Sequence, residues 1–118
     1  MALNVEWNRT PYTLNEEQVK QVVPEKEGIY RLSNTEGVFY VGQSDNLQRR
    51  LLEHLSEEKN DCIKEKLQFK VEFRFALLEG EKERLCAESY MYRHCKKGGE
   101  GECNDKEPIE PPRDMNWY

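Results

Sequence analysis

Residues 28–42, which read GIYRLSNTEGVFYVG, decide the fold of this chain. The runs 28–32 and 38–41 are rich in β-branched and aromatic residues, which favour strands. Between the two runs, Asn34 to Gly37 has turn chemistry, and Gly37 is suited to a positive φ. The stretch therefore predicts a β-hairpin, and Gly42 is expected to break its second strand.

A helix is expected directly after the hairpin, with Ser44 or Asp45 as its N-cap. Apolar residues recur there at helical spacing and predict one buried face. They are Leu47, Leu51, Leu52 and Leu55. Arg50 and His54 stand four residues apart, so both side chains should lie on one side of this helix.

Three further helices are predicted. One runs from about residue 14 to residue 22, because Thr13 and Glu16 have the spacing of a capping box. A weaker signal covers 63–67, and a long helix is expected over about 81–94 after the turn at Gly80.

A third strand is indicated where Phe69, Val71, Phe73 and Phe75 alternate with charged residues. The chain beyond Asn104 is polar and rich in proline, which predicts an extended tail. The predicted order of elements indicates an α/β fold of the α+β type. We expect a small three-stranded, largely antiparallel sheet covered by helices.

Length and composition indicate a single domain over residues 1–118. No apolar run is long enough for a membrane span, and Met1 to Thr10 lacks the features of a secretory signal. A cytoplasmic protein without a membrane partner is therefore expected. The net charge of −5 argues against a surface that coats DNA without selectivity, although a local basic face remains compatible with it.

The four cysteines form no C-x-x-C pair, so the strongest zinc signature is missing. Reduced thiols are the expectation for a cytosolic chain. The alternative is a zinc or disulfide role for Cys95 and Cys103, which bracket a glycine-rich stretch and lie near His94. Zinc analysis with thiol titration separates these cases.

Gly28-Ile29-Tyr30 followed by Tyr40-Val41-Gly42 resembles the paired motifs of the GIY-YIG nuclease domain, with Val41 in place of the middle isoleucine. Arg50 lies in a helix similar to the arginine-bearing helix of that family. Glu88, in the next long helix, and Asn104, beyond it, occupy places where the family keeps a glutamate and an asparagine. The resemblance covers about residues 26–105.

The resemblance implies a catalytic site made of Tyr30, Tyr40, Arg50, His54, Glu88 and Asn104. Glu88 would be the metal ligand, with Mg²⁺, or Mn²⁺ in its place, as the cofactor. Arg50 would bind a phosphate oxygen, and Tyr30 and His54 would take or relay a proton. Tyr40 would orient the metal-activated water or contact the phosphate. Asn104 would hold Tyr30 or a backbone turn, with Asn116 as its alternative.

Gly42, Gln43, Arg49 and Arg50 are the predicted contacts to nucleic acid. Gln43 is a departure, because several relatives carry a lysine or arginine there. Arg49 is turned about 100° from Arg50 on the helix. It is therefore assigned to a backbone phosphate or to solvent.

The leading functional prediction is a metal-dependent endonuclease that cleaves DNA with low intrinsic sequence specificity. A homodimer or a partner protein would then supply specificity, since no added base-reading motif is present. The alternative is a catalytically silent binding module of the same fold. Residues 26–105 are predicted as the nuclease core, 1–25 as a helical extension and 106–118 as the proline-rich tail.

Overall fold

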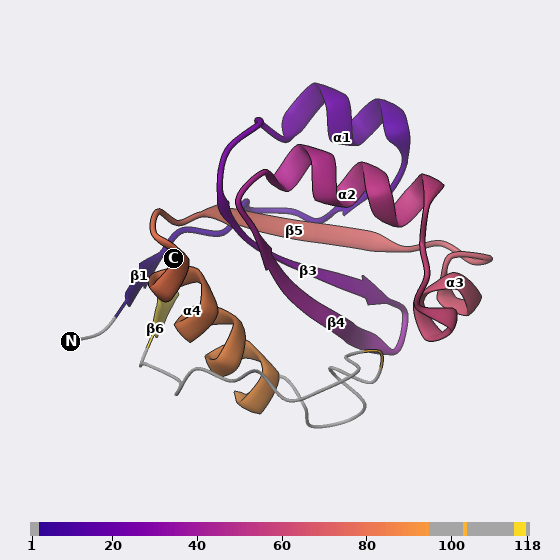
Figure 1. The fold of residues 1–118 in the computed structure, drawn as a ribbon. Helices are drawn as coiled ribbons and strands as arrows, with labels where there is room; N and C mark the ends of the chain where they lie inside the picture. The colour runs from indigo at the N-terminus through magenta and orange to yellow at the C-terminus, as the bar shows by residue number, and fades with distance from the viewer. Residues whose placement is uncertain (1–2, 95–102, 104–114, 118) are drawn as a thin grey trace.

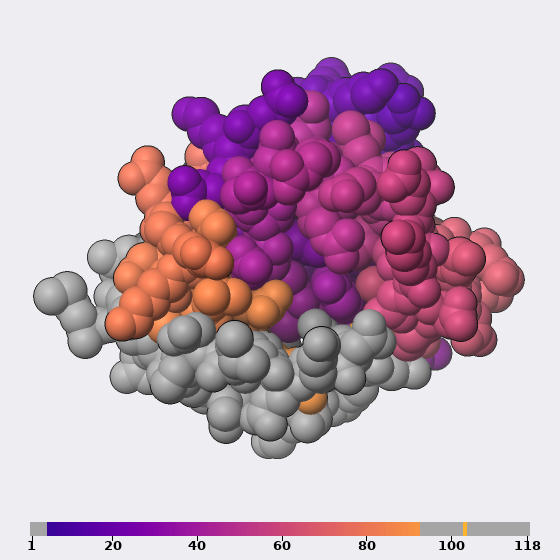
Figure 2. All heavy atoms as spheres, in the orientation of Figure 1, coloured from indigo at the N-terminus to yellow at the C-terminus, as the bar shows by residue number. Residues whose placement is uncertain are grey.

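A computed structural model describes residues 3–94, 103 and 115–117 of the chain. Strands and helices are interspersed along the sequence; Figure 1 shows their arrangement, and Figure 2 shows the heavy atoms in the same orientation. In chain order the elements are β1 (Leu3–Val5), β2 (Tyr12–Thr13), α1 (Glu16–Val22), β3 (Gly28–Asn34), β4 (Gly37–Ser44), α2 (Leu47–Ser56), α3 (Asp61–Lys66), β5 (Glu72–Leu77), α4 (Glu81–His94) and β6 (Met115–Trp117).

The main sheet has four strands in the order β2-β5-β3-β4, and all of its neighbours run antiparallel. The three predicted strands are present, and the short strand β2 adds an edge that the sequence did not predict. The predicted hairpin is confirmed, with Gly37 at φ 126° in its turn. The expected break at Gly42 is wrong, because Gly42 pairs with Tyr30 and β4 continues to Ser44.

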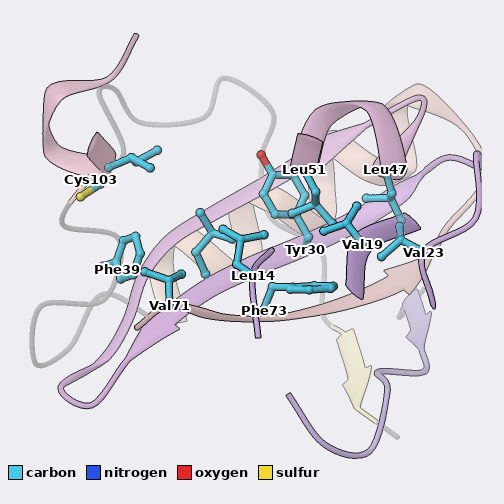
Figure 3. Packing of buried hydrophobic residues seen from close by; sticks show 12 residues of the cluster. Leu14, Val19, Val23, Tyr30, Phe39, Leu47, Leu51, Val71, Phe73 and Cys103 are labelled. Carbon is cyan, nitrogen blue, oxygen red and sulfur yellow. The ribbon is translucent and has the colours of Figure 1, made fainter. Parts of the chain in front are cut away.

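Helices cover both faces of the sheet (Figure 1). Tyr30 belongs to a buried cluster packed under α1 and α2, which Figure 3 shows, together with Leu47 and Leu51 of α2. The neighbouring Ile29 belongs to a second cluster with Ala87 of α4. Successive residues of a strand point to opposite faces, so β3 presents one side chain to each layer.

The helix starts differ from the predicted ones. Asn15, not Thr13, caps α1 by accepting a hydrogen bond from Gln18 N–H, since Thr13 pairs with Glu72 in the sheet. Asn46, not Ser44 or Asp45, caps α2. In both cases an asparagine one or two residues further along supplies the capping oxygen.

The predicted third strand begins later than its alternation indicated. Phe69 lies outside β5 and is 75 % exposed, whereas Val71 and Phe73 are buried as predicted. Phe69 N–H bonds to the Lys66 carbonyl, so the turn that follows α3 still holds the chain at this residue.

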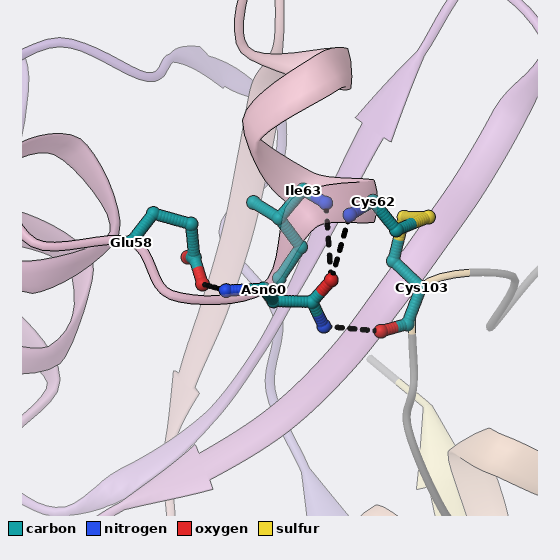
Figure 4. The surroundings of a disulfide bond; sticks show 5 residues. All are labelled: Glu58, Asn60, Cys62, Ile63 and Cys103. Carbon is teal, nitrogen blue, oxygen red and sulfur yellow. Dashed lines mark hydrogen bonds between the residues drawn. A yellow bond between two sulfur atoms is a disulfide. The ribbon is translucent and has the colours of Figure 1, made fainter.

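The expectation of reduced cysteines is wrong for two of the four. Cys62, at the start of α3, forms a disulfide with Cys103, while Cys86 is free and buried (Figure 4). Cys95 lies outside the described residues. Cys103 thus pairs not with Cys95, the alternative that the sequence left open, but with a cysteine 41 residues away.

Segments near the two ends of the sequence pair with each other. β1 and β6 run parallel, with Leu3 opposite Met115 and Val5 opposite Trp117. The segment predicted as a helical extension thus contributes β1 and β2, and the predicted tail contributes β6. Within the described part of the chain, no helix has the length and apolar character to cross a lipid bilayer.

Candidate active site

Tyr30 and His54 form the buried centre of the candidate site. Both side chains are fully buried, and a hydrogen bond of 2.7 Å joins Tyr30 Oη to His54 Nε2. The two rings meet edge to face with their centroids 5.5 Å apart. The predicted neighbourhood of a strand tyrosine and a helix histidine is therefore present, and it joins the sheet directly to α2.

Tyr40 completes an aromatic cluster with these two residues. Its ring centroid lies 6.1 Å from that of Tyr30 and 5.4 Å from that of His54. Unlike them, Tyr40 is only partly buried, and it borders a hollow of about 320 Å³. The lining residues are Tyr40, Arg50, Glu53, Glu57, Glu58, Lys59, Asn60 and Ile63. Tyr40 is thus the member of the cluster that borders this hollow.

Arg50 lies between the hollow and the two tyrosines. Burial alone lowers the pKa of its guanidinium, but its charge and hydrogen-bond interactions with Tyr30 and Tyr40 raise the pKa more, so it stays protonated. Burial raises the pKa of Tyr30 well above its usual range, although Arg50 opposes that rise. Arg50 therefore places a fixed positive charge beside both hydroxyls, as its predicted phosphate-binding role requires.

Glu88 approaches the same site from α4, on the other side of the edge strand β4. Its carboxyl group is partly buried, and this burial raises its pKa to about 7. A backbone hydrogen bond from Gln43 and the charge of Arg50 act in the opposite direction. The long helix α4 thus brings Glu88 near the end of the strand that carries Tyr40.

The residues predicted to bind nucleic acid have unequal surroundings. Arg49 forms exposed ion pairs with Asp45, which precedes α2, and with Glu53 of α2, so its charge is largely compensated. The side-chain oxygen of Gln43 accepts a hydrogen bond of 2.9 Å from Arg84 Nε. Gly42 is buried against the ring of Tyr30. Of this set, Arg50 alone both lines the hollow and touches the aromatic cluster.

Asn104 lies outside the described residues, and so does the side chain of its alternative, Asn116. The residue before Asn104 is placed, however. Cys103 N–H donates to the Phe39 carbonyl at 2.8 Å, and Asn60 Nδ2 donates to the Cys103 carbonyl at 2.7 Å (Figure 4). Phe39 precedes Tyr40 in β4, so Cys103 is held one residue from the candidate site.

Two charged residues at the site were not predicted. Glu58 Oε2 is hydrogen-bonded to His54 Nδ1, and its four-residue spacing from His54 is the one sequence signal for this contact. Arg84 is buried on α4, where it contacts Glu27 as well as Gln43. Arg84 precedes Glu88 by one helical turn, and the sequence offered no signal for its partner Glu27.

No cluster of three or more histidine, cysteine or acidic side chains suited to a metal occurs among the residues the structure describes. Glu88 nevertheless fits a magnesium-type ion. Mg²⁺ binds through one or two carboxylates and fills its other positions with water and phosphate oxygens. A cation stabilises a partly buried carboxylate, so the chemistry of Glu88 suits the role of a protein ligand.

Comparison with known proteins places this chain in a family. The sequence model described as the GIY-YIG catalytic domain matches residues 26–97. The UvrABC system protein C of Bacteroides thetaiotaomicron is 30 % identical over 94 residues, which cover 75 % of this chain and 15 % of that protein. Its counterpart from Bacteroides fragilis is 33 % identical over 76 residues, covering 63 % and 12 %. The chain thus spans only a small part of these relatives.

Solved structures share the fold. The GIY-YIG N-terminal endonuclease domain of UvrC from Thermotoga maritima, a point mutant bound to its catalytic divalent cation, superposes with a TM-score of 0.59 at 19 % identity. The match covers 76 % of this chain and 98 % of that domain. The same domain bound to magnesium gives 0.57 at 19 % identity, over 72 % and 94 %. The predicted fold class is confirmed.

Proposed function

This chain belongs to the GIY-YIG catalytic-domain family, and from this premise we propose that it is a metal-dependent endonuclease that hydrolyses phosphodiester bonds in DNA. The observation that carries the proposal is the cluster of Tyr30, Tyr40 and His54 beside the charge of Arg50, with Glu88 facing it from α4. A scaffold has no need of a buried tyrosine–histidine hydrogen bond next to an arginine and a partly buried carboxylate.

The first task of such a site is to neutralise the negative charge at the reacting phosphate. Arg50 presents a permanently protonated guanidinium at the hollow, where it forks onto a nonbridging phosphate oxygen. Tyr40 borders the same hollow and orients the attacking water or contacts the phosphate. The phosphate therefore enters from the hollow, with the aromatic cluster behind it.

Deprotonation of the attacking water is the second task. Burial raises the pKa of Tyr30, so its phenolate is not populated at neutral pH. Burial also lowers the pKa of His54, which leaves a neutral imidazole 2.7 Å from Tyr30 Oη. Tyr30 therefore acts as a relay, which accepts a proton from water while it passes its own proton to His54.

Glu88 holds the divalent cation, Mg²⁺ or Mn²⁺, in this proposal. When bound, such an ion supplies charge neutralisation at the phosphate and stabilises the leaving oxygen. The magnesium-bound state of the Thermotoga domain, which has the same fold, supports this assignment. The three glutamates around the hollow also favour a cation there and disfavour a bare polyanion, so binding of DNA should depend strongly on salt and metal.

The extent of the working unit is also a proposal. We assign residues 26–105 as the nuclease core and the whole chain as one domain. The family match over 26–97 and the attachment of Cys103 to Phe39 support the core. The β1–β6 pairing supports the single domain. Specificity would come from a DNA structure, a homodimer or a partner protein.

The test is cleavage of supercoiled plasmid and branched DNA at low salt, with Mg²⁺ or Mn²⁺. Glu88→Ala and Tyr30→Phe should each lose about 10²-fold or more in rate, the scale of a removed catalytic group. Glu81→Ala, which removes an exposed carboxylate from the same helix, is the matched control and should cleave normally. A folded wild-type protein that cleaves neither DNA with either ion would favour the catalytically silent module instead.

A further inference from the structure

The loop after α2 contributes a carboxylate to the back of the candidate site. We propose that Glu58 is a positioning residue, which holds His54 in the tautomer that accepts the proton of Tyr30. The inference rests on the proposed nuclease function and deepens it. Glu58 is not among the site residues that the family resemblance implies.

Glu58 is held firmly for such a task. Its side chain is only 8 % exposed, and Oε2 contacts His54 Nδ1. The other carboxylate oxygen accepts a hydrogen bond of 2.9 Å from Asn60 N–H, and Asn60 in turn caps α3 (Figure 4). Both oxygens of Glu58 are therefore engaged, and the carboxylate cannot turn away from His54 without also losing its bond to Asn60 N–H.

The chemistry of the two rings fixes the direction of the hydrogen bonds. An ionised carboxylate is an acceptor only, so the bond to Glu58 requires the hydrogen to lie on His54 Nδ1. A neutral imidazole carries one N–H, which leaves Nε2 as an acceptor. Tyr30 Oη is 2.7 Å from Nε2 and must therefore donate its hydrogen. Glu58 thus determines where the Tyr30 proton points.

This arrangement balances the proton transfer without a free phenolate. As Tyr30 Oη gains a proton from the attacking water, its own O–H bond breaks and a bond to His54 Nε2 forms. The resulting imidazolium carries one positive charge, which the Glu58 carboxylate compensates. After the phosphodiester bond breaks, the leaving oxygen takes a proton from solvent. His54 then returns its proton to Tyr30, which releases one to solvent.

The groups around His54 determine how a change at Glu58 should act. Tyr30 faces it from β3, Tyr40 from β4, and Arg50 and Glu53 from its own helix. Arg50 lowers the pKa of His54, whereas Glu58 and Glu53 raise it. Replacing Glu58 with glutamine therefore removes a group that stabilises the imidazolium, and its amide can donate to Nδ1 and place the hydrogen on Nε2 instead.

The tautomer can be observed directly, without any cleavage assay. The sequence contains only two histidines, so ¹⁵N labelling of histidine gives two rings, and His94→Gln assigns them. In the wild-type protein the neutral His54 ring should carry its hydrogen on Nδ1. In Glu58→Gln the Nε2–H form should increase and the ring should titrate at lower pH. A wild-type ring with its hydrogen on Nε2 overturns the proposal, whatever the variant does.

Single-turnover cleavage across pH supplies the functional readout. The rate should rise with pH as His54 loses its proton. Glu58→Gln should lower the plateau rate by about 10-fold to 10²-fold with little change in KM. It should also shift the rising, acidic limb of the pH–rate profile to lower pH. Glu65→Gln is the matched control, because Glu65 is exposed on α3, lies outside the lining of the hollow and removes the same charge. A purely structural loss would not move the limb.

The outcomes separate the two proposals. Wild-type rates and an unshifted limb in Glu58→Gln, together with an inactive Glu88→Ala, would overturn the role of Glu58 and leave the nuclease intact. An inactive wild type with the Nδ1–H tautomer would remove the nuclease proposal, and the Glu58 proposal with it, but would keep the contact. Equal effects of Glu65→Gln and Glu58→Gln would reduce the role of Glu58 to a general effect of charge.

Discussion

Tyr30 lies directly across Gly42, its partner in the β3–β4 pair. A Cβ atom at residue 42 would come within 2.6 Å of both Cζ and Oη of Tyr30, closer than side-chain atoms approach one another. Because Gly42 lies within a strand, the glycine is not explained by a turn. Its missing side chain gives Tyr30 the space to reach His54, so the two halves of the motif depend on each other sterically.

Gly42→Ala is therefore expected to displace Tyr30. The ring is fully buried and cannot move aside freely, so overpacking should cost about 1–3 kcal/mol in the free energy of unfolding. Cleavage should fall as well, because the bond to His54 is disturbed. Chemical denaturation measures the first effect. In a Tyr30→Phe background the destabilisation should persist, since Cζ is as close as Oη. A penalty that disappears there would identify the hydroxyl as the obstacle.

Glu88 should make the protein without metal less stable at high pH. Its folded-state pKa of about 7 lies above the ordinary 4.5, so the folded protein binds this proton more tightly than the unfolded chain does. The stabilisation is complete below pH 4.5 and is lost as the pH rises through 7. At pH 8 with a chelator, Glu88→Gln should unfold at a higher temperature than wild type. The difference in the free energy of unfolding should be at most about 3 kcal/mol.

Magnesium should raise the unfolding temperature of the wild type above that of Glu88→Gln. A cation that binds the folded state raises the unfolding midpoint. The midpoint of Glu88→Gln should not respond, and its cleavage should be lost. An equal magnesium response in both proteins would place the ion elsewhere. Equal midpoints across the pH range would show that Glu88 is ionised without cost.

Reduction of the Cys62–Cys103 disulfide should destabilise the fold. The bond joins residues 41 positions apart, and closing a loop of that length is worth about 3–4 kcal/mol through the entropy of the unfolded chain. Denaturation with and without a thiol reductant measures the loss. The Cys62→Ser, Cys103→Ser double variant should resemble the reduced protein and should not respond to reductant. A wild-type protein that does not respond would contradict the assignment.

Local patterns predicted the hairpin, the helix after it and the long helix α4, because each has strong signals close together in the sequence. The same patterns misplaced helix starts where the sheet competed for the same residues. Thr13 has the chemistry of a cap, but its backbone pairs with Glu72, and Asn15 caps α1 instead. Whether Thr13 caps a helix or pairs in the sheet depends on β5, whose residue Glu72 lies far along the chain. Local spacing does not encode that pairing.

The candidate site divides in the same way. Tyr30, Tyr40, Arg50 and His54 lie on adjacent elements, so their predicted proximity follows from the hairpin and the helix after it. The contact of Glu58 with His54 was not predicted, because Glu58 lies just beyond the end of α2, where helical spacing no longer guarantees a contact. The Cys62–Cys103 pairing had no local signal, since only the folded chain brings the two cysteines together.

The disulfide also changes the route by which the chain assembles. Phe39 and Cys103 form a backbone hydrogen bond, and the path between them along the backbone runs through α2, α3, β5 and α4. Through the sulfur–sulfur bond, the path passes α2 and ends at Cys62. Shorter paths cost less entropy to close and speed folding. A chain that refolds with the bond already formed should therefore complete the region beside Tyr40 sooner than a reduced chain, so oxidation acts on folding speed as well as on stability.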